Sequence, residues 1–258
     1  MFSRLSTALR QRFASDHVVL DDLVIPARHL RRCGAEFQDD QYFVESARLE
    51  ASKLMDLCDL TVDDHVLDVG CGPGRLAVGW LAGSGHMPNY HGMDINKASI
   101  DWCVKHLAPL DARLKFSHLD LFNERYNPTG QPFTPTTRLP YESGFFQGIY
   151  LYSVFSHMTS SDIRIYLREF ARLLVPGGRV FLTAFVEPGV PDEEENPSGY
   201  GLDWHGSLHC VRFDKEYFEN MVEAAGLHVV EFRHGTETNG QSALLLALQT
   251  PSGTRTPS

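Results

Sequence analysis

Three glycines follow a short apolar run and could hold a ligand against the backbone. Gly70, Gly72 and Gly74 come directly after residues 66–69, in the order strand, glycines, helix. Glycine suits this place because the chain turns sharply and because a Cβ would block a ligand lying on the backbone. A dinucleotide fingerprint requires a glycine at position 75, where this chain has Arg75. The spacing therefore favours a ligand without a pyrophosphate, although a tight turn that binds nothing could have the same glycines.

Two aspartates stand at the ends of the next two predicted strands. Asp94 lies about 20 residues after the glycines, where a carboxylate can accept hydrogen bonds from both hydroxyls of a ribose. An aspartate at a strand end is often a helix N-cap, but Asn96 and Ser99 are available for that role, so we assign Asp94 to the ligand. Asp120 is followed by apolar side chains, beginning with Leu121. An acid in this setting can accept from an adenine amino group while the apolar side chains cover the ring.

Three histidines are candidates for a general base. His157 follows the fourth predicted strand by two residues, at the rim of the sheet, and histidine titrates near the working pH. The same residue could instead orient the helix that begins near Thr159. His205 and His209 belong to a long loop after the fifth strand, which would cover a substrate. Their i, i+4 spacing also occurs at metal sites, but no third ligand is nearby in the sequence, so we predict no metal.

Other residues of the loops and of the N-terminal part could shape or charge a pocket. The aromatic-rich loop 123–146, with Tyr200 and Trp204, could shape a pocket for a ring or a sugar face, or could serve loop packing alone. Arg31, Arg32 and Arg48 could meet a carboxylate, although surface solvation is the commoner role of such side chains.

Apolar runs that alternate with helical stretches place these residues in an α/β fold. Helices between successive strands imply right-handed crossovers, so most of the strands are parallel. The last two strands lack a helix between them, and Asn239-Gly240 is a turn signal that predicts an antiparallel hairpin. We predict a Rossmann-like, doubly wound, seven-stranded sheet that is mostly parallel, with an antiparallel last strand. The predicted strands are 65–71, 89–94, 114–120, 148–155, 179–186, 228–233 and 242–249, and the predicted helices are 39–60, 74–82, 97–107, 160–175 and 214–225.

The chain divides into three predicted parts. Residues 1–60 are expected to form an N-terminal helical cap, with an amphipathic helix at 1–13 and with Asp39 or Asp40 as the N-cap of the helix 39–60. Residues 61–249 form the α/β domain, and the Pro/Ser/Thr/Gly-rich residues 250–258 form a disordered tail. Within the domain, Pro176-Gly177-Gly178 is expected to end a helix. Residues 123–146 and 187–212 are long loops, and loops of this length are usually functional or disordered.

The composition is that of an ordinary globular protein with an acidic balance. The 258 residues include 23 basic and 33 acidic side chains, for a formal net charge of −10, and 43% are hydrophobic. This balance makes a nucleic-acid partner unlikely, because domains that bind nucleic acid usually carry a basic excess. The five cysteines form no CxxC pair, which is typical of a reducing compartment, and no apolar run is long enough to span a membrane. We therefore expect a cytoplasmic protein that is a monomer or a homodimer.

With these motifs, the chain resembles the class I S-adenosylmethionine-dependent methyltransferases over residues 61–249. The segment LDVGCGPG carries the resemblance most specifically, and IYLYSVFSHM and LLVPGGRVFLTAF are similar to the family's fourth-strand and fifth-strand segments. The resemblance implies the cofactor S-adenosyl-L-methionine, which becomes S-adenosyl-L-homocysteine. Many members have an acid before the fourth strand, where this chain has Gln147. That departure puts one local hydrogen bond in doubt.

The resemblance also implies which residues of the glycine loop bind the cofactor. Gly70, Gly72 and Gly74 would line its methionine part. Asp68 would lie beneath the loop, near the amino group.

Further cofactor contacts implied by the resemblance come just after the second, third and fourth strands. Asp94 would bind the ribose, and Ile95 would lie on the adenine face. Asp120 and Leu121 would hold the adenine edge. Tyr152 would contribute backbone beside the methyl group.

These observations favour a methyltransferase that acts on a hydroxyl group of a small molecule or a glycan, with His157, His205 or His209 as the base. No motif for nitrogen or carbon acceptors follows the fourth strand. Methylation of a protein or RNA group is an alternative that the acidic balance disfavours. A non-catalytic regulatory subunit that binds S-adenosylmethionine is a second alternative, because the glycines and acids indicate cofactor binding but do not indicate turnover. A nicotinamide oxidoreductase is disfavoured by Arg75 at the third glycine position.

Overall fold

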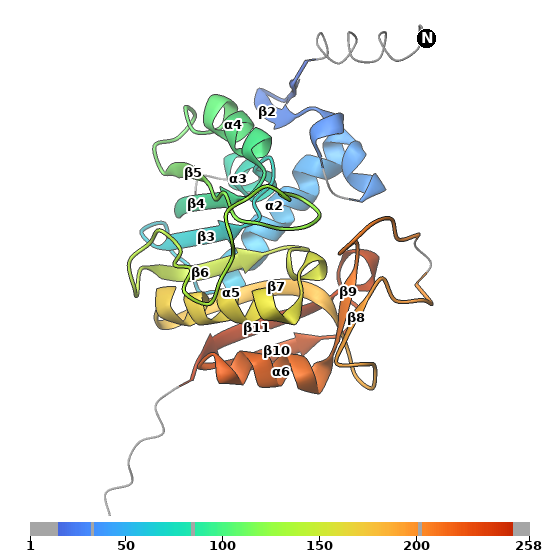
Figure 1. Cartoon of the computed structure of the whole chain (residues 1–258). Coiled ribbons are helices and arrows are strands. Elements are labelled where there is room, and N and C mark those ends of the chain that lie inside the picture. Colours follow the sequence, from blue (N-terminus) through green and yellow to red (C-terminus); the bar gives the residue numbers. More distant parts are fainter. Residues whose placement is uncertain (1–14, 32–33, 84–85, 201–202, 250–258) are drawn as a thin grey trace, which may run out of the picture.

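The protein is built around a mixed β-sheet whose strands lie in the order β10-β11-β7-β6-β3-β4-β5 (Figure 1). The computed structural model describes residues 15–31, 34–83, 86–200 and 203–249. Strands β7, β6, β3, β4 and β5 are mutually parallel, and β11 runs antiparallel to both β7 and β10. The predicted Rossmann-like sheet with one antiparallel strand is therefore confirmed. The seven strands are β3 (His65–Val69), β4 (Asn89–Asp94), β5 (Leu114–His118), β6 (Phe146–Leu151), β7 (Leu174–Glu187), β10 (Leu227–Arg233) and β11 (Ser242–Leu248).

The strand order reverses its direction of growth between β3 and β6. From β3 the chain adds β4 and β5 on one side, and it then crosses to β6 on the other side of β3. Open α/β sheets bind ligands at such a switch point, beyond the carboxyl ends of the strands. The ends of β3, β4 and β6 therefore mark the place where a site is expected.

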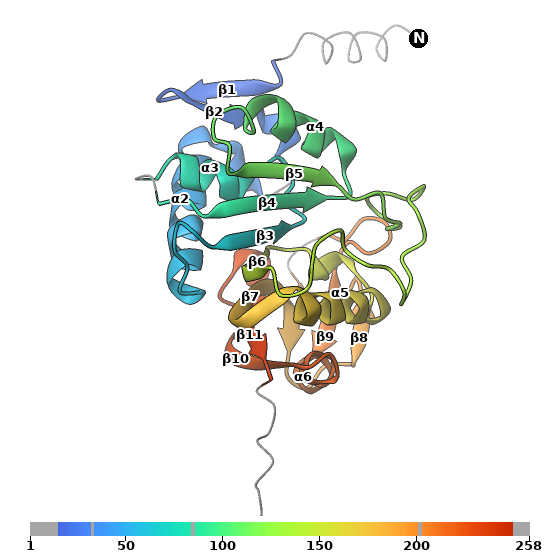
Figure 2. The same ribbon diagram turned by 90° about the vertical axis from the view of Figure 1, so that its left-hand side faces the viewer.

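Helices cover both faces of the sheet, as the two views in Figures 1 and 2 show. One face carries α2 (Asp40–Leu57), α3 (Arg75–Leu81) and α4 (Lys97–His106), and the other carries α5 (Ser160–Leu173) and α6 (Lys215–Ala224). In the part of the chain that the structure describes, no helix is both long and apolar enough to cross a membrane.

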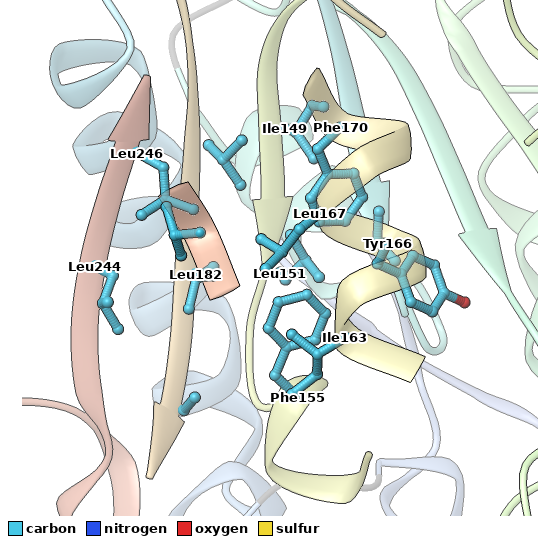
Figure 3. Packing of buried hydrophobic residues seen from close by; sticks show 14 of the residues in the cluster. Ile149, Leu151, Phe155, Ile163, Tyr166, Leu167, Phe170, Leu182, Leu244 and Leu246 are labelled. Carbon is cyan, nitrogen blue, oxygen red and sulfur yellow. The ribbon is translucent and has the colours of Figure 1, made fainter. Parts of the chain in front are cut away.

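Alternate residues of the central strands enter two hydrophobic clusters. Tyr150 of β6 packs in the cluster with α2, α3 and α4, whereas its neighbours Ile149 and Leu151 pack in the cluster with α5 and α6. Figure 3 shows the second cluster, in which the rings of Phe155 and Phe170 stack with their centroids 6.2 Å apart. Burial on both faces explains why these strands read as nearly continuous apolar runs.

The N-terminal part contains a β-hairpin where the sequence predicts a helical cap. Strand β1 (His17–Leu20) pairs antiparallel with β2 (Leu23–Pro26), and two short 3-10 helices, Arg28–Leu30 and Ala35–Gln38, lead to α2. Asp21 and Asp22 both have positive φ, 49° and 64°, which is the geometry of a type I′ turn. An Asp-Asp turn between two β-branched runs is the signal that the helical interpretation missed. The helix predicted at 1–13 and the tail predicted at 250–258 lie outside the described residues.

Asp16 connects this hairpin to α4 through hydrogen bonds and an ion pair. Its backbone carbonyl accepts a hydrogen bond from Trp102 Nε1 at 2.7 Å, and its carboxylate lies 2.8 Å from Lys105 Nζ. Hydrogen bonds with His17, Lys105 and His106 hold the pKa of Asp16 well below its usual range. The hairpin is therefore joined to the main domain by both charge and backbone contacts.

The start of α2 is as the sequence predicts. Asp39 is the N-cap and accepts a hydrogen bond from Tyr42 N–H at 2.8 Å. Arg31 is buried beside this turn, where it pairs with Asp40 at 2.7 Å and donates to the carbonyl of Pro26 at 2.9 Å. Arg31 therefore joins the hairpin to α2 and is neither a pocket residue nor a surface charge.

Two other predicted boundaries differ from the structure. Helix α5 ends before Pro176-Gly177-Gly178, and these residues belong to β7, whose pairing with β6 shifts register there. Strand β6 ends earlier than predicted, because the backbone at Ser153 has a φ of 58°.

The long loop predicted at 187–212 contains two short strands. Strand β9 (Val211–Asp214) runs parallel to the end of β7, and β8 (Glu193–Glu195) pairs antiparallel with β9. The turn predicted at Asn239-Gly240 is confirmed, with Asn239 at a φ of 60°.

Candidate active site

A cavity of about 620 Å³ opens at the carboxyl ends of β3, β4 and β6, where the switch point lies. Its lining includes two groups of residues that could bind ligands. The glycine-loop part comprises residues of the loop after β3 and of the end of β4: Asp68, Gly70, Gly72, Asp94 and Ile95. The aromatic part comprises side chains from the segments after β5, after β6 and between β8 and β9: Arg125, Tyr126, His157, Trp204 and His209.

The glycine loop is held by the end of β4 and leaves an open surface. Gly70 N–H donates to the carbonyl of Met93 at 2.8 Å. A Cβ at Gly72 would meet no atom within 4 Å, and Gly72 lines the cavity. A Cβ at Gly74 would lie 2.5 Å from Leu107 Cδ1, so Gly74 permits α3 to pack against the end of α4. Gly72 is thus the position at which a side chain would fill space open to a ligand.

Asp94 shares its carboxylate with the glycine loop. Gly72 N–H donates to Oδ2 at 2.7 Å, and Asn96 N–H donates to Oδ1 at 2.6 Å. A carboxylate can accept several hydrogen bonds, so these two bonds do not exclude hydroxyl donors. The side chain of Asn96 accepts from Ser99 N–H at 2.9 Å and caps α4. Asp94 is therefore not needed as the cap of that helix.

Asp68 lies buried beneath the loop and is the second acid of the lining. Tyr90 donates its hydroxyl hydrogen to Asp68 Oδ2 at 2.7 Å. Burial raises the pKa of Asp68 to about 7, against the opposing effects of the Tyr90 hydrogen bond and the charge of Arg75. At and above neutral pH the carboxylate can therefore bind a positive group.

The role of Arg75 in the lining was not predicted. Its guanidinium lies over the ring of Tyr152 at 4.9 Å and over that of Phe37 at 5.3 Å, and Nη2 donates to the hydroxyl of Tyr150 at 3.2 Å. These contacts tie the start of α3 to the N-terminal part and to the end of β6. Because Phe37 and Tyr152 are distant in the sequence, no spacing around Arg75 could have indicated this arrangement.

The structure brings most of the predicted cofactor residues to the cavity. Those that line it are Asp68, Gly70, Gly72, Asp94, Ile95 and Tyr152. Gly74, Asp120 and Leu121 do not line it. Asp120 is exposed and accepts from Asn127 Nδ2 at 3.0 Å, whereas Leu121 is buried. The reason is that β5 ends two residues before Asp120, so that Leu119 and not Asp120 lines the cavity there.

Gln147, which stands where an acid was expected from the resemblance, makes a hydrogen bond to the start of β3. Its side-chain carbonyl Oε1 accepts from His65 N–H, at the start of β3, at 2.7 Å. The amide therefore serves as an acceptor at this position, as a carboxylate would.

His157 has a defined tautomer. Its Nδ1 lies 3.0 Å from the carbonyl oxygen of Leu208. A carbonyl can only accept, so the proton of the neutral ring is on Nδ1 and the free lone pair is on Nε2. Burial lowers the pKa of His157 to about 4, and the charges of Arg125 and His209 act in the same direction. The ring is therefore neutral at physiological pH and can accept a proton at Nε2.

Asn123 orders the loop that brings Arg125 and Tyr126 over His157. Its Nδ2 donates to the carbonyl of His157 at 3.2 Å, and its Oδ1 accepts from the N–H groups of Arg125 and Tyr126 at 3.1 and 3.0 Å. The ring of Tyr126 meets His157 edge-on, with centroids 5.4 Å apart. The sequence pointed to the aromatic-rich loop 123–146 as a wall of a pocket, but not to these three residues.

Of the two other candidate bases, His209 lines the cavity and His205 does not. His205 N–H donates to His209 Nδ1 at 2.6 Å, so the proton of a neutral His209 is on Nε2. Trp204 also lines the cavity and packs edge-on against His209 and Phe185. Tyr200 does not line it; its ring packs against Phe185 and Trp204.

Two of the arginines predicted from the N-terminal part, Arg31 and Arg48, do not line the cavity. Arg31 is buried in the hairpin connection, Arg48 is exposed on α2, and Arg32 lies outside the described residues. In the described lining, the positive charges come from Arg75 and Arg125.

The fold and the site together define the class of this protein as a Rossmann-like α/β domain with a ligand-binding glycine loop at its switch point. Residues 35–232, which are most of the chain, match the family model described as a methyltransferase domain. The chain therefore belongs to the methyltransferase domain family, and the resemblance to class I methyltransferases is confirmed.

The chain is similar in sequence to a named plant protein and in fold to solved structures of other proteins. It is 28% identical over 197 residues to the phosphoethanolamine N-methyltransferase of Triticum aestivum, which covers 74% of this chain and 33% of that protein. The chain thus matches about a third of the length of that relative. A structure of the [4+2]-cyclase SpnF has a TM-score of 0.58 at 15% identity, covering 80% of this chain and 82% of that one. The Burkholderia thailandensis 1,6-didemethyltoxoflavin-N1-methyltransferase, solved with S-adenosylhomocysteine, has a TM-score of 0.54 at 16% identity, covering 82% of both chains. These two structures show the fold alone.

Proposed function

We propose that the protein transfers a methyl group from S-adenosyl-L-methionine to a hydroxyl group of a small molecule or glycan. The observation that carries the proposal is the open surface at Gly72, with Asp94 and Asp68 in the same part of the lining. The cofactor, when bound, supplies an electrophilic methyl group on a sulfonium. Gly72 would hold its methionine part, Asp94 would accept from the ribose hydroxyls, and Asp68 would face the amino group. A neighbour of the same fold was solved with S-adenosylhomocysteine, which supports this choice.

The aromatic part of the lining supplies a base for the acceptor. Methyl transfer requires the acceptor oxygen to lie in line with the methyl carbon, and the hydroxyl must lose its proton. The bound cofactor would supply the methyl group and leave as S-adenosylhomocysteine, and His157 Nε2 would receive the proton of the acceptor hydroxyl. The hydrogen bond from Nδ1 to Leu208 fixes the ring for this role. His209 would orient the acceptor by donating from Nε2.

A nitrogen acceptor is the second candidate, and the lowered pKa of His157 favours it. An uncharged amine attacks with its own lone pair, so a weak base is sufficient. The wheat relative and the Burkholderia neighbour are both named as N-methyltransferases. Identification of the methylated atom in the product decides between oxygen and nitrogen.

Calorimetry with three ligands tests the cofactor assignment. We expect S-adenosylmethionine and S-adenosylhomocysteine to bind in the micromolar range and NAD to bind negligibly, because the glycine loop lacks the third dinucleotide glycine. Tighter binding of NAD would contradict the proposal. Cell extract supplied with S-adenosylmethionine labelled in its methyl group would then identify the acceptor by the label it gains.

A further inference from the structure

Arg125 has hydrogen-bonding capacity that the described residues do not use. Its Nη1 donates to the carbonyls of His205 and Ser207, at 2.9 and 3.4 Å. Its Nε is buried and has no hydrogen-bond partner among the described residues, although Arg125 lines the cavity. A buried, unpaired N–H on a charged group costs more free energy than a paired one, so its presence calls for a partner.

The charge of Arg125 is also not neutralised by the part of the chain that the structure describes. No carboxylate of those residues lies within ion-pair distance of it. Arg212 provides a contrast, because its Nε is equally unpaired but its guanidinium contacts Glu194 at 2.5 Å and Glu187 at 3.7 Å. Arg212 does not line the cavity. Of these two arginines, the one without a carboxylate partner among the described residues is thus the one that lines the cavity.

Around Arg125 the described residues place an aromatic ring and two histidines. Its guanidinium lies 5.6 Å from the ring of Tyr126, and its charge acts on His157 and His209, both of which have lowered pKa values. A guanidinium presents planar N–H donors that match the oxygens of a carboxylate or a phosphate. In a chain with a net charge of −10, such a group is a specific means of attracting an anion.

We propose that Arg125 binds an anionic group of the methyl acceptor, so that the substrate is a small carboxylate or phosphate compound. The inference rests on the proposed function, because it names the class of acceptor for the same cavity. Arg125 would hold the anion through its unused N–H groups, while Tyr126 and Trp204 cover the carbon skeleton. His157, beside Arg125, would then receive the reacting group.

Small aromatic probes of different charge test this proposal by calorimetry on the protein loaded with S-adenosylhomocysteine. The probes are 4-hydroxybenzoate and phenyl phosphate, with 4-hydroxybenzamide as the neutral comparison. We expect at least one anion to bind about tenfold or more tighter than the amide, as charge-assisted hydrogen bonds to a guanidinium imply. The anion that binds better distinguishes a carboxylate acceptor from a phosphate acceptor.

Three variants assign the preference to Arg125. Arg125→Gln should abolish the preference for the anion, and Arg125→Lys should retain part of it because the charge remains while the planar fork is lost. Arg48→Gln removes an exposed charge on α2 and should retain the whole preference.

The outcomes separate an anion-binding role from a structural one. If Arg125 served only to bond the carbonyls of His205 and Ser207, Arg125→Gln would weaken amide and anion binding equally. That result would overturn the proposal, as would equal binding of anions and amide to the unmodified protein, or binding of none of the three probes. The same titrations begin with S-adenosylhomocysteine. Its failure to bind would instead contradict the proposed function, whereas normal binding without an anion preference would reject the anionic acceptor alone.

Discussion

The two parts of the cavity lining are built in different ways. In the glycine-loop part, backbone N–H groups of Gly70 and Gly72 bond to the carbonyl of Met93 and the carboxylate of Asp94, all at the ends of two paired strands. In the aromatic part, side chains carried by loops reach distant segments: Asn123 bonds to a carbonyl 34 residues away and Arg125 to one 80 residues away. The first part is therefore fixed by the sheet, whereas the second depends on how three loops meet.

This difference implies a division of labour. A site made of backbone at the end of a sheet suits a ligand that does not vary, which is the cofactor. A site made of loop side chains can change without disturbing the sheet, which suits the acceptor. If the division holds, a substitution in one part should leave the ligand of the other part unaffected.

The largest expected effect comes from His157. We expect His157→Ala to lower kcat by roughly 10²–10⁴-fold for a hydroxyl acceptor, the usual contribution of a positioned base, with little change in the affinity for S-adenosylhomocysteine. The pKa of about 4 places the acidic limb of the rate profile near pH 4, with activity lost as the pH falls and His157 becomes protonated. Steady-state kinetics across pH measure both kcat and its pH dependence. The acidic limb of the rate profile should vanish in His157→Ala.

His29→Ala, at an exposed position outside the cavity, is the matched control and should keep the activity. A structural His157, which orients the following helix, would instead give a variant with a lower melting temperature and unchanged kcat. Unchanged kcat with product methylated on nitrogen would favour the second candidate function.

The next largest expected effect is a loss of cofactor affinity, and it tests the glycine-loop part of the lining. Asp94→Ala should weaken S-adenosylhomocysteine binding by roughly 1.5–3 kcal/mol, the cost of losing charge-assisted hydrogen bonds to two hydroxyls. Calorimetry measures this affinity, and Asp101→Ala, at an exposed acid on α4, is the control that should bind normally. Because Asp94 also accepts from Gly72 N–H, thermal unfolding of the variant is followed in parallel. Normal cofactor affinity with lowered stability would make Asp94 a purely structural residue.

The same contrast explains what could be predicted from the sequence. The glycine loop and Asp94 were recognised because strand, glycines and acid stand in a fixed local order. Asp120 does not line the cavity, because β5 ends at His118 and not at residue 120 as the sequence predicts, so Leu119 stands in the lining there. Arg75 and Arg125 were not assigned to the site. Their partners lie far away in the sequence and come near only when the chain folds, so no local pattern could indicate them.

The smallest expected effect concerns Asp68 and the pH dependence of cofactor binding. Burial raises the pKa of Asp68 to about 7 in the free protein, so near neutral pH about half of the molecules carry a neutral carboxyl group there. A positive amino group beside Asp68 favours the ionised form, so binding should release this proton. Affinity for S-adenosylhomocysteine should therefore rise with pH through about 7 and fall below it, by at most about tenfold per pH unit for one proton.

Calorimetry between about pH 6 and 8, in buffers of different ionisation enthalpy, measures both the affinity and the number of protons released. Asp68→Asn should lose this pH dependence, because an amide does not titrate. Arg125→Gln should keep it, because Arg125 belongs to the aromatic part of the lining. Affinity that is independent of pH in the unmodified protein would mean that the amino group lies away from Asp68. A changed pH dependence in Arg125→Gln would instead show that the two parts of the lining are coupled, which contradicts the division between them.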